Sequence, residues 1–60
     1  MNNYNVKVEI ESHTGEILIL ETQRTFAAED DVSVFASGFA DGFAMAHDGA
    51  ILNRQIQRIS

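Results

Sequence analysis

Apolar and polar side chains alternate strictly along the first part of the chain. Between residues 4 and 11 the apolar positions are Tyr4, Val6, Val8 and Ile10, with polar residues between them. A period of two is typical of a β-strand that has one buried face and one wet face. A second run, from Glu16 to about Gln23, follows the short segment His13-Thr14-Gly15. The pattern therefore predicts a β-hairpin over about residues 4–23.

The loop of this hairpin predicts its register. A three-residue loop whose last residue is Gly15 suits a type I turn followed by a left-handed residue. That loop pairs Ile10 with Leu18 and Val8 with Leu20, so the apolar side chains meet on one face. On the other face it sets Lys7 opposite Glu21. A two-residue loop would place Val8 opposite Glu21 and bury a carboxylate, because a slip of one residue moves every side chain to the wrong face.

Helical spacing replaces the alternation further along the chain. The apolar residues that recur every three or four positions are Val32, Phe35, Ala36, Phe39, Phe43 and Ala46. Acidic residues at 29–31 favour the positive end of a helix dipole, and His47 falls in the last turn. Gly49 is a suitable left-handed stop. We expect a helix over about residues 28–47, with its N-cap at Thr25 or a few residues later.

The last segment fits either a helix or a strand. Leu52, Ile56 and Ile59 stand at helical spacing, whereas residues 54–59 are also compatible with a short strand. A strand over about 51–59 is favoured, because a two-stranded hairpin under one helix is a thin sandwich. The predicted fold is a single α+β domain over residues 1–60, strand-strand-helix-strand, with an antiparallel sheet of order 2-1-3. The expected core is Tyr4, Val6, Val8, Ile10, Leu18, Leu20, Val32, Phe35, Phe39, Phe43 and Ile56.

Charge narrows the choice of partner. The 60 residues carry nine acidic and four basic side chains, for a net charge of −5. Residues 1–53 hold −7, and Arg54 and Arg58 add +2. A net negative chain is repelled by phosphate backbones, which disfavours nucleic acid and favours a protein partner with a basic surface. Without a membrane-length apolar run, a signal peptide or cysteine, we expect a cytoplasmic location.

Candidate catalytic and metal-binding residues are sparse. There is no cysteine, and the adjacent Ser12 and His13 lie on a turn, which does not aim one side chain at the other. His47 has Phe43 and Ala44 at the spacings where a second metal ligand on the same helix would stand. Glycine spacings match neither a phosphate-binding loop nor a dinucleotide fingerprint. We therefore expect no enzyme activity, no cofactor and no metal.

Two groups of residues are candidates for binding a partner. In the predicted register Ile17 and Ile19 lie on the outer sheet face with Glu9 and Glu11, as an apolar centre with a charged rim would. The second group comprises Gly38 and Gly42, for which we expect close packing against the helix's own sheet or against a second chain, with Asp41 and Met45 on the far side of the helix.

These features favour a small acidic interaction module that binds and modulates, or inhibits, a larger protein. In size, charge and layout the chain resembles small phage or mobile-element proteins that inhibit host enzymes or defence systems, although no motif carries this resemblance. The alternative is a self-associating structural protein, a homodimer or a larger homo-oligomer, whose exposed isoleucine or glycine surfaces pair with themselves.

Overall fold

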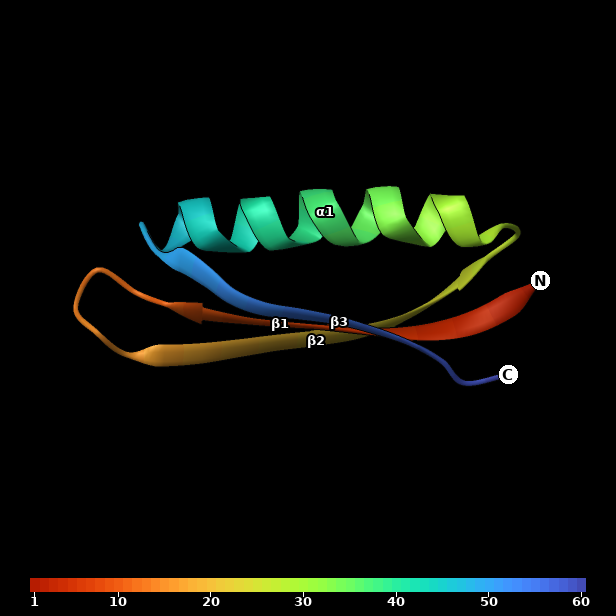
Figure 1. Ribbon diagram of the computed structural model, residues 1–60, viewed down its shortest axis with the longest axis horizontal. Helices are drawn as coiled ribbons and strands as arrows, with labels where there is room; N and C mark the ends of the chain where they lie inside the picture. Colours follow the sequence, from red (N-terminus) through yellow and green to blue (C-terminus); the bar gives the residue numbers. More distant parts are fainter.

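The computed structural model describes residues 1–60 as a three-stranded antiparallel sheet with one helix along one face (Figure 1). The strands are β1 (Asn2–Glu11), β2 (Ile17–Phe26) and β3 (Ala50–Arg58), and the helix is α1 (Glu29–Ala46). The sheet order is β2-β1-β3, which confirms the predicted α+β class and the order 2-1-3. The molecule is elongated, with extents of 39 × 16 × 13 Å. Both termini lie at the end where β2 leads into α1 (Figure 1).

The hairpin has the predicted register. Ile10 pairs with Leu18, Val8 with Leu20 and Lys7 with Glu21. The Gly15 amide donates to the Ser12 carbonyl at 2.9 Å, and Gly15 has φ of +87°, as a left-handed third loop residue requires. The Glu21 carboxylate accepts a hydrogen bond from the Asn5 amide at 2.7 Å, so Glu21 bonds to its diagonal neighbour on β1, although Lys7 lies directly opposite it as expected.

The prediction that Thr25 caps the helix is wrong. Strand β2 continues to Phe26, and the Thr25 hydroxyl donates to the side-chain oxygen of Asn3 on the neighbouring strand. Ala28 takes the N-cap position without a side-chain bond to the helix. The later entry was the correct alternative, because the antiparallel ladder with β1 holds residues 25 and 26 in extended conformation.

The C-terminal end of the helix also differs from the prediction. His47 is the C-cap, and the left-handed residue is Asp48 at φ of +50°, not Gly49. The Asp48 amide donates to the Met45 carbonyl and the Gly49 amide to the Ala44 carbonyl, which is the bond pattern of a Schellman motif. Gly49 serves a different purpose, because a Cβ there would lie 2.5 Å from the backbone oxygen of Glu11.

The buried core is smaller than predicted and uses smaller helix residues. The fully enclosed side chains are Tyr4, Val6, Val8 and Ile10 from β1 and Val32, Ala36, Ala40 and Ala44 from α1. Leu18 and the phenylalanines of the helix are only half-buried, and Ala46 is exposed. Leu20 and Ile56 remain 38% and 40% exposed, because they lie on edge strands while the helix covers mainly the central strand.

Candidate functional site

The face of the sheet opposite the helix is bare (Figure 1). The even-numbered residues of β1 are buried against α1, so its odd-numbered residues and their cross-strand partners point away from the helix. No other part of the chain covers this outer sheet face. A side chain placed there by the alternation is free to meet a partner.

One end of the outer sheet face is apolar and acidic. Ile17 pairs with Glu11 and Ile19 pairs with Glu9, so the four residues predicted from the sequence are direct cross-strand neighbours. Ile17 is 54% exposed and Ile19 is 56% exposed. We call these four residues the Ile–Glu patch. Its two carboxylates lie on the central strand, along one side of the two aliphatic side chains, which suits a partner that presents cations beside an apolar surface.

The remainder of the outer sheet face is rich in amides. Strand β1 contributes Asn3 and Asn5, β2 contributes Gln23, and β3 contributes Asn53, Gln55 and Gln57. These are six of the seven Asn and Gln residues in the chain. Side-chain amides both donate and accept hydrogen bonds and carry no net charge. The sequence pattern did not predict this amide patch, because its members lie on three strands and meet only when the sheet forms.

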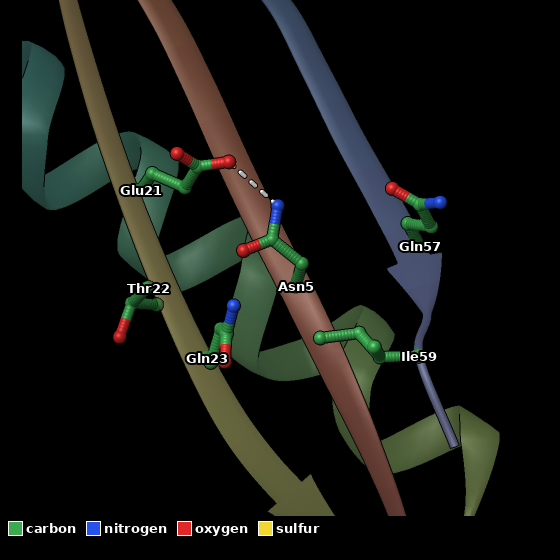
Figure 2. Close-up of a pocket in the computed structure, with 6 residues that line it drawn as sticks. All are labelled: Asn5, Glu21, Thr22, Gln23, Gln57 and Ile59. Atoms are coloured by element: carbon green, nitrogen blue, oxygen red, sulfur yellow. Dashed lines mark hydrogen bonds between the residues drawn. The ribbon is translucent and has the colours of Figure 1, made fainter.

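A shallow hollow of about 440 Å³ lies over the amide patch. Figure 2 shows Asn5 donating to Glu21 across the neighbouring strands, with Gln57 of β3 and Ile59 just after β3 on the other side. Apart from Ile59 its lining residues are polar. The hollow therefore offers hydrogen-bonding groups on an open surface, without the apolar enclosure that is usual for a small-molecule site.

The second predicted group lies on the opposite side of the molecule. Gly38, Asp41, Gly42 and Met45 share the exposed face of α1, and Met45 is 82% exposed. A Cβ added at either glycine would meet nothing within 4 Å. The predicted packing of these glycines against their own sheet is therefore wrong, because Val32, Ala36, Ala40 and Ala44 form the face that touches the sheet. One flat partner surface cannot cover both groups.

The two histidines meet at the end of the molecule that holds the hairpin loop. His13 donates from Nδ1 to the backbone oxygen of His47 at 3.4 Å, and the His47 ring packs edge-on against Phe43 with centroids 5.1 Å apart. These contacts tie the loop to the C-terminal end of the helix. No group of three His, Asp or Glu side chains is arranged to hold a metal ion.

Two further observations complete the description. No helix of the structure is long and apolar enough to cross a membrane. The chain matches no protein-family model, no curated protein and no solved structure.

Proposed function

We propose that this chain is a non-enzymatic interaction module that binds a larger protein through the Ile–Glu patch and modulates that protein by covering its surface. The observation that carries the proposal is the pair of isoleucines, each more than half exposed, beside two glutamates on a sheet face that the chain leaves bare. A partner with an apolar centre and a basic rim would complement this surface.

The architecture supports binding over catalysis. No carboxylate, histidine, lysine or arginine side chain is buried, so none of these groups is held in the desolvated setting that tunes catalytic residues. Strands hold the Ile–Glu patch in a fixed geometry, which lowers the entropic cost of association. Inhibition of a host protein, which the size, charge and layout of the chain suggest, would then follow from occupancy of the partner's basic surface.

Selection from a random peptide library tests the proposal without a known partner. The immobilised protein should enrich peptides that combine Lys or Arg with apolar residues. The double variant Ile17→Lys with Ile19→Lys removes the apolar centre and places two cations against those of the peptide. We expect at least about tenfold weaker binding of the selected peptides by this variant, because it loses the apolar contact and gains repulsion.

A matched control carries the same change on the opposite face. Val34 and Met45 on α1 are 74% and 82% exposed, so Val34→Lys with Met45→Lys adds the same charge without touching the sheet. This control should bind the selected peptides as the unaltered chain does, apart from the general effect of two added charges. Enrichment of acidic peptides would contradict the proposal, and so would an equal loss of peptide binding in both double variants. Circular dichroism establishes that each variant is folded.

A further inference from the structure

The outer edge of β2 has no neighbouring strand. In the order β2-β1-β3 this strand pairs with β1 alone. The Ser12 amide donates to the Glu16 carbonyl at 2.8 Å, which sets the even-numbered residues of β2 to bond toward β1. The backbone groups of Ile17, Ile19, Glu21 and Gln23 therefore point outward, by the alternation of an antiparallel ladder. The chain contains no proline, so this edge is a complete template for another strand.

On the side that faces the helix, the same edge has apolar side chains that are only partly buried. Leu20 is 38% exposed, although its partner Val8 on the central strand is fully buried. Leu18 and the row Phe35, Phe39 and Phe43 are half-buried. The ring centroid of Phe35 lies 5.4 Å from that of Phe26 on β2 and 5.3 Å from that of Phe39, which places this aromatic row on the β2 side of α1.

We propose that a second copy of this chain pairs with the β2 edge, antiparallel and about a two-fold axis at Leu20. In this register Leu20 meets the partner's Leu20, and Ile19 lies opposite the partner's Glu21. Glu16 then lies opposite the partner's Arg24, and the symmetry repeats this opposite-charge pair at the other end. The edge is therefore complementary to itself in backbone bonding, apolar contact and charge.

Two alternative arrangements are less favourable. An axis at Glu21 would set this carboxylate directly opposite the partner's Glu21, and like charges in that position are destabilising. The outer edge of β3 is also open, but its charged residues are Arg54 and Arg58 with no acid between residues 50 and 60. Antiparallel pairing about Ile56 would oppose Arg54 to the partner's Arg58.

Pairing at β2 accounts for the large side chains on that flank. Three strand spacings would separate the two β1 strands, about 14 Å, and the helices above them would be similarly far apart. Helices in direct contact lie only 8–10 Å apart, so the gap needs large side chains to fill it. The aromatic row of each copy, on the β2 side of α1, stands in this position.

The dimer would also enlarge the outer sheet face. Three strands of nine or ten residues cover about 33 × 14 Å, roughly 460 Å², whereas a standard protein interface buries about 800 Å² on each side. A six-stranded sheet doubles the available area and joins the two Ile–Glu patches into one surface. The dimer does not depend on the basic partner, since it uses the edge and leaves the face open.

A charge-swap experiment tests the register. In Glu16→Arg both cross-dimer pairs become Arg–Arg, and in Arg24→Glu both become Glu–Glu. Each variant alone should dimerise about tenfold more weakly than the unaltered chain in sedimentation velocity over a concentration series. An equimolar mixture of the two variants should recover the dimer, because every cross-dimer pair is then Arg–Glu. Residues 16 and 24 are about 27 Å apart along one strand, so this recovery cannot arise within one molecule.

A further variant separates dimerisation from folding. Arg24 lies over the Phe35 ring, 4.9 Å from its centroid, so Arg24→Glu also removes a contact within the monomer. Arg24→Gln removes that contact without reversing the charge and should dimerise better than Arg24→Glu. Three results would overturn the proposal: a monomeric unaltered chain at every concentration, particles that grow without limit, or a mixture that sediments like its separate components. None of these results bears on peptide capture by the Ile–Glu patch.

Discussion

Gly49 stands where the end of the helix meets the end of the first strand. A Cβ at this position would lie 2.5 Å from the Glu11 carbonyl oxygen and 3.3 Å from the Cα of Ser12, both backbone atoms. Its φ is not positive, so glycine is needed here for closeness and not for conformational freedom. The left-handed turn that precedes it falls instead on Asp48, a residue type that tolerates this region better than most.

Replacing Gly49 should therefore be costly. Gly49→Ala forces the backbone of β1 and the helix end apart, and overpacking of this kind costs about 1–3 kcal/mol. Urea denaturation followed by circular dichroism measures the change in the free energy of unfolding. Gly15→Ala serves as a comparison, because Gly15 has open space around it and would lose stability only through its positive φ. If Gly49→Ala leaves the free energy of unfolding unchanged, the backbone at Glu11 and Ser12 moves aside freely.

Helix α1 has two faces of small residues with opposite surroundings. Ala36, Ala40 and Ala44 lie buried against the sheet, whereas Gly38 and Gly42 face open space. Small side chains on the inner face let the helix lie close over the central strand. The phenylalanines at the next positions are displaced toward β2 and remain half-buried. The glycines have no packing role inside one molecule.

Replacing the helix glycines should stabilise the monomer. Gly38→Ala and Gly42→Ala each remove a backbone entropy cost of about 1 kcal/mol and meet no neighbouring atom. If the two effects add, the free energy of unfolding of the double variant should be about 2 kcal/mol higher than that of the unaltered chain. Thermal and urea melts measure this change. A loss of stability at high protein concentration alone would indicate that another chain packs against these glycines.

The whole molecule rests on a core of eight buried residues. Folded chains are stable by roughly 0.05–0.15 kcal/mol per residue, which amounts to about 3–9 kcal/mol for this length. Domains of this size bury a low share of their surface and sit near the limit of stability. A substitution that shortens one buried side chain can therefore remove a large part of the free energy of unfolding of the monomer.

Ile10 offers the sharpest test of that core. Ile10→Ala empties a fully buried position and should lower the free energy of unfolding by about 2–5 kcal/mol, a large share of the stability of the monomer. Its control is Ile17→Ala on the outer sheet face, where the side chain is more than half exposed and the change should stay below about 1 kcal/mol. Urea denaturation followed by circular dichroism compares the two variants. Similar losses in both would mean that the outer face is covered in solution.

Strand pairing could be predicted from the sequence because its causes are local. Alternation from Tyr4 to Ile10 and a loop ending in Gly15 leave one register that buries apolar side chains and no carboxylate. The same pattern placed Ile17 and Ile19 on the outer sheet face beside Glu9 and Glu11. The helix followed from periodicity, and the third strand was favoured because a two-stranded hairpin under one helix is a thin sandwich.

Tertiary structure decided what the chain pattern could not. Periodicity marks a helix face but not its distance from the sheet, so it could not show that alanines would fill the contact and phenylalanines would lie beside it. It could not show that Gly38 and Gly42 face outward, or that amides from three strands meet on one surface. Leu20 and Ile56 stay exposed for the same reason: one helix is narrower than three strands, and only the folded molecule shows which edges it leaves open.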